Sequence, residues 1–370
     1  MTFAIHGIDT ALPKHTMSQA EATELAQQVI CRDEQQRRLV AALYRKAGVE
    51  NRFTALPHRT ALRWLPEGVE HQGTERQGSE PPPINGPSTA ERMQFYAECA
   101  SPLAATAATR ALAGARVKPS DITHLITVTC TGFGAPGVDI ALINRLGLRP
   151  TTQRVQVGFM GCHGAINGLR VAKALAEADP AARVLLVAVE LCSLHYRFRW
   201  DPERIVANAL FADGAAAVVG WDEPSEASKS DWRVAATGSC LIPNSVDAMS
   251  WNIGDSGFEM TLNARVPDLI REHLRPWLTT WLEQHDLDLA RIASWAIHPG
   301  GPRILSAIEE ALGLVSTATS VSRDVLAWHG NMSSPTVLFI VNQLREAGAK
   351  RPCVALGFGP GLMAEAALFG

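Results

Sequence analysis

Three residues that lie far apart in the chain have side chains able to act together in catalysis: Cys162, His298 and Asn331. A cysteine thiolate is a nucleophile, a histidine exchanges protons, and an asparagine amide donates hydrogen bonds. Together these groups could form one site for nucleophilic catalysis. The chemistry requires that the fold bring the three elements carrying them to one point.

Cys162 lies between a predicted strand and a predicted helix. Apolar residues alternate from Val155 to Phe159, which indicates a strand entering a core, and an alanine-rich helical pattern follows from Ala165 to Leu175. The N-terminal end of a helix stabilises an anion, so we expect the pKa of the Cys162 thiol to be lowered. The alternative is that Cys162 is an ordinary small buried cysteine.

His298 and Asn331 also lie at the ends of predicted buried elements. The strand Trp295 to Ile297 stops at His298, and α/β sheets bind their ligands at strand ends. Asn331 lies in HGNMSS, before an apolar helical run. An isolated histidine of this kind is often a core residue with satisfied hydrogen bonds, but its combination with a cysteine and an asparagine favours one active site.

Composition narrows the class of protein. The chain has 370 residues, of which 46% are hydrophobic and 19% charged, and a net charge of −3, so no general attraction to nucleic acid or to an anionic membrane is expected. The N-terminus lacks a cationic segment followed by an apolar one, and no apolar run approaches about 18 residues. We therefore expect a cytoplasmic location. The seven cysteines form no CxxC pair, which predicts reduced thiols and no metal site.

The order of predicted elements is that of an α/β protein. Cationic residues around Tyr44 to Lys46 and Asn51 to Phe53 suit either the phosphates of a nucleotide-bearing substrate or a solvated helix end. The remaining expectations are a strand over 3–10, a helix over 18–47 interrupted near residue 31, a surface loop over 66–87, a capped helix over 88–115, a strand over 121–131, a helix over 138–146, a strand over 183–189, a loop over 192–204 and a strand over 215–220.

The second half of the sequence repeats the first. Residues 121–126 correspond to 291–296 at an offset of 170, and the turn at Gly161 corresponds to Gly330 at an offset of 169. We infer two halves, residues 1–225 and 226–370, whose mostly parallel sheets have helices between and outside them. This symmetry predicts that Cys162 and Asn331 lie at two facing helix N-termini.

Five motifs carry a specific resemblance. The motifs GCHGA around Cys162, ALFADGAAA around Phe211, WAIHPGGPRIL around His298, HGNMSS around Asn331 and GFGPGL near the end resemble those of the type III polyketide synthases, the chalcone and stilbene synthase superfamily. The resemblance implies a thiolase-like αβαβα layered fold and a homodimer. It also implies an acyltransferase that acts directly on coenzyme A thioesters, with no other cofactor.

The same resemblance assigns roles to residues. It implies that Cys162 carries the starter acyl group and that His298 holds it as a thiolate. His298 and Asn331 would then bind the thioester carbonyl of malonyl-CoA and stabilise the enolate formed by decarboxylation. Phe211 matches a gatekeeper aromatic residue. Lys46 and Arg303 match cations for CoA phosphates, although two further expected cations are replaced here by Leu39 and Ala42.

Cavity positions separate the subfamilies. A second gatekeeper phenylalanine of the plant enzymes is Met260 here, and a glycine that controls their chain extension is Trp251, which argues against a chalcone or stilbene product. Residues 247–270 resemble bacterial alkylpyrone and alkylresorcinol synthases, which implies a fatty acyl-CoA starter. The small residues that would line its alkyl tunnel are Thr131, Ala135 and Cys192. Two more substrate-binding positions are His195 and Ser333.

Other functions stay open at this point. A malonyl-primed or short-chain aromatic polyketide synthase and a single-condensation β-ketoacyl synthase III would use the same cysteine, histidine and asparagine. The PGG sequence after His298 and the GFGPGL loop favour the polyketide family over the β-ketoacyl synthase. A catalytically silent subunit would be expected to lack Cys162.

Overall fold

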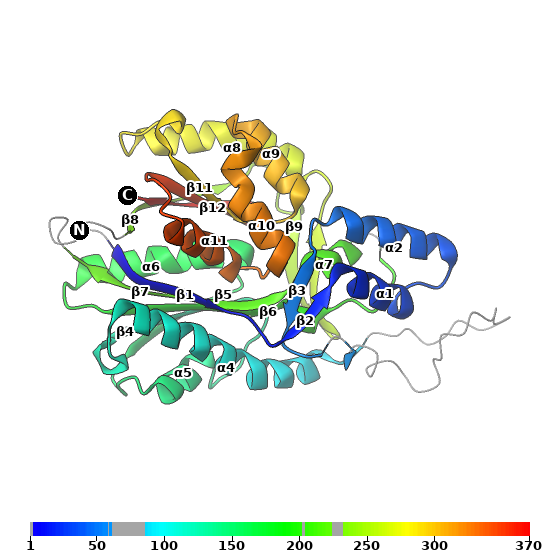
Figure 1. Ribbon diagram of the computed structural model, residues 1–370, viewed down its shortest axis with the longest axis horizontal. Helices are drawn as coiled ribbons and strands as arrows, with labels where there is room; N and C mark the ends of the chain where they lie inside the picture. Colours follow the sequence, from blue (N-terminus) through cyan, green and yellow to red (C-terminus); the bar gives the residue numbers. More distant parts are fainter. Residues whose placement is uncertain (1–2, 58, 61–85, 202–203, 224–231) are drawn as a thin grey trace.

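The computed structural model describes residues 3–57, 59–60, 86–201, 204–223 and 232–370, and its main feature is a sheet of nine strands in the order β11-β12-β13-β8-β1-β7-β6-β4-β5 (Figure 1). The surface loop predicted over 66–87 lies almost wholly outside these residues. The strands of the sheet are β1 (Phe3–Ala11), β4 (His124–Thr129), β5 (Gln153–Gly158), β6 (Val184–Leu191), β7 (Asp213–Asp222), β8 (Arg233–Leu241), β11 (Ser294–Ile297), β12 (Cys353–Gly359) and β13 (Met363–Phe369).

The sheet consists of two halves that meet where β1 pairs with β8 over two residue positions. Within the halves, β4 runs parallel to β5 and β6, and β11 runs parallel to β12, as the repeat predicts. The pairs β6–β7, β7–β1, β12–β13 and β13–β8 are antiparallel. The prediction of mostly parallel sheets is therefore wrong. A short turn after the glycine loop brings β13 straight back along β12, and antiparallel strands permit such a tight connection.

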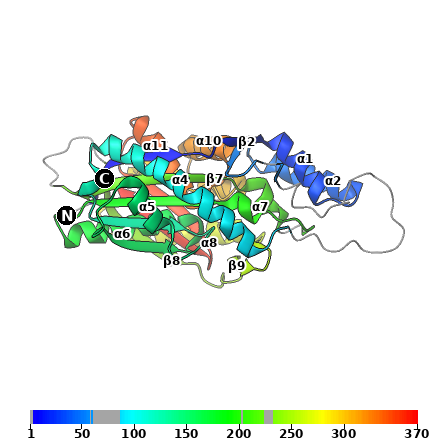
Figure 2. The ribbon, with the colours of Figure 1, turned by 90° about the horizontal axis from the view of Figure 1, so that it is seen from below.

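Helices cover both faces of each half, which produces five layers. The helices α6 (Gly164–Ala178) and α11 (Pro335–Glu346) pack between the two halves, against strands of both. The helices α4 (Thr89–Ala115) and α5 (Val138–Leu146) cover the outer face of the first half, and α8 (Val266–Glu283) and α9 (Pro302–Leu312) cover that of the second (Figures 1 and 2). This arrangement is the predicted thiolase-like αβαβα fold.

A smaller group of elements projects from one end of these layers. It contains α1 (Gln19–Val29), α2 (Glu34–Lys46), α7 (Ile205–Leu210) and the paired strands β2 (His15–Ser18) and β3 (Asn51–Thr54). Figures 1 and 2 both place α1 and α2 at this end. Buried apolar residues of α1 and α2 pack on residues of α7. The remaining hairpin consists of β9 (Met249–Gly254) and β10 (Gly257–Leu262).

Local sequence explains most element boundaries. Ser18 and Ser88 cap α1 and α4, each with a glutamate three residues later that completes a capping box. Gly147 and Gly313, which end α5 and α9, have φ values of 69° and 70°, in the left-handed region that glycine adopts readily. The repeat breaks after this point. The first half continues with β5, whereas the second continues with helix α10 (Ser320–His329).

The strand β5 differs from its prediction in one respect. It is the outermost strand of the sheet and is largely exposed, so it does not enter a core. Val155 is 41% exposed, and Phe159 and Met160, which follow the strand, are 37% and 44% exposed. The apolar alternation is therefore present on an edge that nothing covers within the described chain.

Candidate active site

Cys162 lies in a short 3-10 turn, Gly161–His163, that leads directly into α6. Gly161 has φ of 74°, and a Cβ at this position would lie 2.5 Å from Pro360 of the glycine loop, so only glycine fits. A Cβ on Gly164 would lie 3.5 Å from Ser334, just before α11. The starts of α6 and α11 therefore face each other, as the repeat predicts.

Asn331 reaches the site from a loop and not from the first turn of a helix. It follows α10 and precedes α11 by three residues. Its backbone forms a bridge to Phe211: the Asn331 N–H donates to the Leu210 carbonyl at 2.9 Å, and the Ala212 N–H donates to the Asn331 carbonyl at 2.9 Å. The Asn331 Oδ1 accepts from the Ser333 N–H at 2.8 Å, which leaves the amide nitrogen to face the cavity.

His298 is held at the end of β11 by its backbone. Its N–H donates to the Leu356 carbonyl at 2.8 Å, and the residue is 2% exposed. Neither ring nitrogen has a hydrogen-bond partner within the described residues. Buried polar groups are normally paired. The unpaired imidazole of His298 is therefore able to form a hydrogen bond with a substrate oxygen.

Burial is the main cause of the pKa shifts of Cys162 and His298. It raises the pKa of the Cys162 thiol to about 12, against which hydrogen bonds with Ser333 and Asn331 lower it. Burial and the neighbouring His163 lower the pKa of His298 to about 3, so this ring is neutral. The pKa of Cys162 is therefore raised, and not lowered as its position before α6 predicted. The dipole of α6 does not compensate for desolvation of the thiolate while His298 carries no charge.

Two cavities meet at this catalytic group. The smaller one, with about 560 Å³ of space between atoms, is lined by Cys162, His298 and Asn331 and by Gly300 and Ile304 at the start of α9. The larger one, with about 990 Å³, part of it open to solvent, extends from Cys162 toward α1 and α2. Both cavities share the same group of wall residues: Cys162, Arg204, Ala207, Phe211, Met249 and Met260. Phe211 and Met260 thus lie on the boundary where gatekeepers are expected.

The larger cavity brings together most of the predicted substrate-binding positions. Its lining includes Thr131, Cys192, His195, Trp251 and Ser333. Ala135 is the exception: it is exposed and does not line the cavity formed by the single chain. The loop that carries Ala135 lies outside the wall, because its neighbour Phe133 stacks on Phe258 with ring centroids 5.9 Å apart.

Two of these residues have their polar atoms occupied by the protein. The Thr131 hydroxyl donates to Glu190 Oε2 at 2.7 Å and accepts from the Leu191 N–H at 2.9 Å. The His195 Nε2 donates to the Thr131 carbonyl at 2.7 Å, and its Nδ1 accepts from the Phe258 N–H at 2.9 Å. Burial lowers the pKa of His195 to about 3. Both residues therefore offer the cavity apolar surface and a fixed wall.

Glu190 is a part of the site that the sequence interpretation missed. Its buried carboxylate accepts from the Cys130 N–H at 2.9 Å, from the Thr131 hydroxyl and from the Ser334 hydroxyl at 2.6 Å, and burial raises its pKa. These bonds join β6, the end of β4 and the start of α11 around Cys162. An acidic residue near the end of the otherwise apolar strand VLLVAVEL was the clue available in the sequence.

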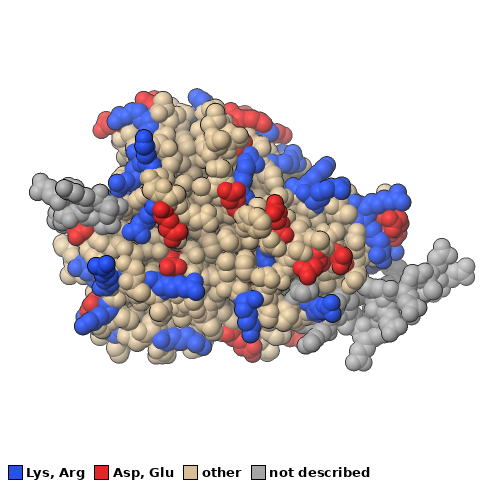
Figure 3. Space-filling model, viewed as in Figure 1, with Lys and Arg blue, Asp and Glu red and all other residues tan. Residues whose placement is uncertain are grey.

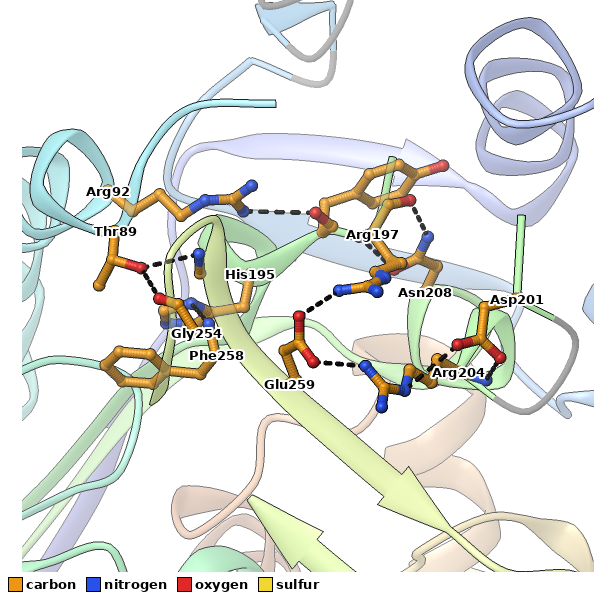
Figure 4. A network of polar contacts seen from close by, with 12 residues as sticks. Thr89, Arg92, His195, Arg197, Asp201, Arg204, Asn208, Gly254, Phe258 and Glu259 are labelled. Atoms are coloured by element: carbon orange, nitrogen blue, oxygen red, sulfur yellow. Dashed lines mark hydrogen bonds and ion pairs between the residues drawn. The ribbon is translucent and has the colours of Figure 1, made fainter. Parts of the chain in front are cut away.

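An ion-pair network forms part of the cavity wall near the hairpin β9–β10 (Figure 4). Glu259 accepts from Arg197 at 2.6 Å and also pairs with Arg204, which contacts Asp201 at 3.2 Å. Asn208 fixes the backbone of Arg197, with its Oδ1 accepting from that residue's N–H at 2.9 Å. The network connects β10 to the segment before α7 and so stabilises the wall next to Phe211.

The cations predicted for CoA phosphates are exposed and lie on neighbouring segments. Lys46 ends α2, and Arg303 is at the start of α9. A Cβ on Gly48 would lie 2.7 Å from Pro302, so the two segments are in contact beside the smaller cavity. Figure 3 shows basic side chains gathered over the end of the molecule that α2 occupies.

Arg52 and Tyr44 do not join these cations. Arg52 is 2% exposed and donates to backbone carbonyls of α7 and its C-terminal end, and Tyr44 is 1% exposed. Arg52 is therefore not available to a phosphate, and Tyr44 is not part of a solvated helix end. Both line the larger cavity instead.

The match to known families covers nearly the whole chain. Residues 2–224 match the N-terminal domain of chalcone and stilbene synthases, and residues 233–370 match their C-terminal domain. The chain belongs to the chalcone and stilbene synthase family. It is a type III polyketide synthase and hence an acyltransferase, of a family that needs no cofactor beyond its CoA thioester substrates.

Similar proteins come from bacteria and from eukaryotes. The chain is 34% identical to the alpha-pyrone synthesis polyketide synthase-like Pks18 of Mycobacterium tuberculosis, over 99% of this chain and 90% of that protein. It is 33% identical to 1,3,6,8-tetrahydroxynaphthalene synthase of Streptomyces peucetius, over 98% and 91%. The crystal structure of PKS-I from the brown alga Ectocarpus siliculosus superposes with a TM-score of 0.89 at 28% identity, covering 100% of this chain and 98% of that one.

The described residues contain neither a membrane-spanning helix nor a metal-binding cluster. No helix there is long and apolar enough to cross a bilayer. In the same part of the chain, no group of three or more histidine, cysteine, aspartate or glutamate side chains is arranged to hold a metal ion.

Proposed function

We propose that this enzyme joins a fatty acyl-CoA starter to malonyl-CoA by decarboxylative Claisen condensation and releases an alkylpyrone or alkylresorcinol-type product. The observation that carries the proposal is the larger cavity, which begins at Cys162 and continues between apolar residues of β2 and α1. Its wall exposes far more apolar than polar surface, and each methylene buried there contributes roughly 0.8 kcal/mol. The similarity to the pyrone-forming Pks18 supports the same product class.

The proposed loading step uses the two groups at the catalytic junction. The Cys162 sulfur attacks the thioester carbon of the starter while His298 takes the thiol proton. The bond between that carbon and the CoA sulfur breaks, and the CoA thiolate receives the proton from His298. The acyl chain then extends into the larger cavity.

In the proposed condensation, malonyl-CoA enters through the smaller cavity with its phosphates near Lys46 and Arg303. The bond between the malonyl methylene carbon and its carboxylate breaks, the carboxylate leaves as carbon dioxide, and hydrogen bonds from His298 and Asn331 to the thioester oxygen stabilise the enolate that forms. The enolate carbon attacks the acyl carbonyl, and the Cys162 thiolate departs. The new β-ketoacyl-CoA is two carbons longer.

We also propose a homodimer that forms through the exposed edge of the sheet. Val155 of β5, the neighbouring Phe159 and Met160, and Phe133 are all exposed large apolar residues. An uncovered apolar edge strand favours pairing with another chain. Ala135 lies on this surface, so its proposed contact with substrate depends on the dimer. Light scattering on the wild type and on Val155→Lys tests this: a monomeric wild type would contradict it.

Product analysis tests the proposed activity. Acetyl- to palmitoyl-CoA are each incubated with malonyl-CoA, and the products are identified by mass, with Cys162→Ala as the inactive control. Alkylpyrones or alkylresorcinols from long-chain starters are expected. A product derived from malonyl-CoA alone would identify a malonyl-primed synthase, and release after one condensation would identify a β-ketoacyl synthase. We retain the cytoplasmic location and the division of the chain at residues 225 and 226 as predictions.

A further inference from the structure

The end of the larger cavity farthest along α1 and α2 contains polar groups that a simple alkyl chain would not use. Met17, Ala22 and Leu25 form an apolar lining there, yet Tyr44 and Tyr196 line the same cavity. Tyr44 comes from α2, and Tyr196 follows the 3-10 turn after β6. The cavity that Cys162 lines therefore also presents two phenol side chains.

The hydroxyl groups of both tyrosines are buried, and they are hydrogen-bonded to each other and to no other group within the described residues. Tyr44 is 1% exposed. The two phenols are close enough for each to affect the pKa of the other, and burial raises the pKa of Tyr44 to about 12 and that of Tyr196 also upward. Each hydroxyl therefore keeps its proton and can act as a donor.

Arg52 supplies a third donor at the same place. Its Nη1 donates to the Asn208 and Phe211 carbonyls at 2.7 and 3.0 Å, and its Nη2 donates to the Ala209 carbonyl at 2.6 Å and to Gln19. These four bonds use both terminal nitrogens. The Nε–H is buried and has no partner in the described part of the chain.

The O–H that the tyrosine pair leaves free and the Arg52 Nε–H both belong to residues that line the cavity, and they favour an acceptor atom as their ligand. A buried donor without a partner carries a desolvation cost, so nearly all such groups in folded proteins are paired with protein or with ordered water. Asp213 is the carboxylate whose charge acts on Arg52. It already accepts hydrogen bonds from Ser193 and from the Ala55 N–H at 2.7 Å. The missing acceptor is thus either water or an oxygen atom of the substrate.

We infer that the starter acyl chain carries an oxygen acceptor, a hydroxyl or a carboxylate, near its distal end, which binds Tyr44, Tyr196 and the Nε of Arg52. The inference rests on the proposed use of an acyl-CoA starter and adds to it the chemistry of the starter's far end. A plain alkyl chain of the same length would fill the passage but supply no acceptor to these donors.

The test compares matched starters. For even chain lengths from six to sixteen carbons, kcat/KM is measured for the plain acyl-CoA, the ω-hydroxyacyl-CoA and the ω-carboxyacyl-CoA. At the length that brings the oxygen to the tyrosines, we expect the wild type to prefer an oxygenated starter by about five- to tenfold, the value of one additional net hydrogen bond. The hydroxyl and carboxyl arms distinguish the two kinds of acceptor.

Tyr44→Phe and Tyr196→Phe should remove most of this preference, measured within each variant as the ratio of kcat/KM for the oxygenated and the plain starter of the same length. Their melting temperatures should stay close to that of the wild type, because each hydroxyl is bonded only to the other phenol and to no further group in the described residues. Tyr96→Phe is the matched control: the Tyr96 hydroxyl donates to Thr129 at 2.7 Å and does not line this cavity, so the preference should persist.

Three outcomes are decisive. Equal or poorer use of oxygenated starters at every length would assign the donors to water and overturn the inference, while leaving the fatty acyl proposal intact. A preference that survives in both phenylalanine variants would also overturn it. Failure of the wild type to accept any acyl-CoA starter would instead refute the proposed function, and with it this inference.

Discussion

Replacing His298 by glutamine should abolish the thiolate form of Cys162 at neutral pH. Burial, with a smaller contribution from the Glu190 carboxylate, raises the pKa of this thiol to about 12, and a neutral His298 does not counteract that. Transfer of the thiol proton to the imidazole would create an ion pair in which each charge stabilises the other. Glutamine retains a hydrogen-bond donor but cannot take the proton.

The magnitude follows from the raised pKa. A thiol with a pKa of about 12 is ionised to only ~10⁻⁴ at pH 8, and the reactive fraction rises about tenfold for each pH unit. In His298→Gln, the rate of alkylation by iodoacetamide should therefore climb without a plateau to at least pH 9. The wild type should reach a plateau at a lower pH and react at least ~10²-fold faster at pH 7.

The assay follows labelling of Cys162 by mass spectrometry, since Cys130 and Cys192 line the same cavity and must be counted separately. Cys162→Ala identifies the background. The same pH profile in His298→Gln and in the wild type would show that His298 does not hold the proton of Cys162. The base would then have to be another group.

Three further predictions follow from the site. Cys162→Ala should abolish acyl loading, seen by intact mass, while the melting temperature stays close to that of the wild type, because alanine is a good helix former and only the sulfur is lost. Asn331→Ala should slow malonyl-CoA decarboxylation by about 10²–10³-fold, the usual cost of an oxyanion donor, and an unchanged rate would remove Asn331 from that role. Cys192→Phe should block the larger cavity and shift the preference from palmitoyl- toward acetyl-CoA, with overpacking costing about 1–3 kcal/mol; a parallel loss for all starters would indicate a damaged core.

The catalytic residues could be predicted because each marks the boundary of a buried element. Cys162 and His298 interrupt long apolar patterns, and the repeat pairs the turn before Cys162 with the one before Asn331. A sequence pattern does not give the charge state of the site, however. We expected a lowered pKa for Cys162 because the residue lies near a helix start. Burial of the thiol raises that pKa and is the larger of the two effects.

Tyr44 shows an error that periodicity could have prevented. It precedes Arg45 and Lys46 at the end of α2, and this neighbourhood suggested a solvated helix end. The buried residues of α2 are Val40 and Tyr44, four positions apart and so on one face of the helix. Ala135 and β5 could not be placed correctly in the same way, because apolar alternation does not distinguish a covered strand from an exposed edge.

One segment connects specificity to catalysis in this enzyme. Arg52, in the wall of the larger cavity, donates to carbonyls of Asn208, Ala209 and Phe211, and the backbone next to Phe211 is hydrogen-bonded to Asn331. A change in Arg52 would therefore alter the distal cavity, the gatekeeper and the catalytic amide together. The tyrosine hydroxyls have no such structural bonds. They are the atoms through which the starter's far end can be examined without moving the residues that carry out the condensation.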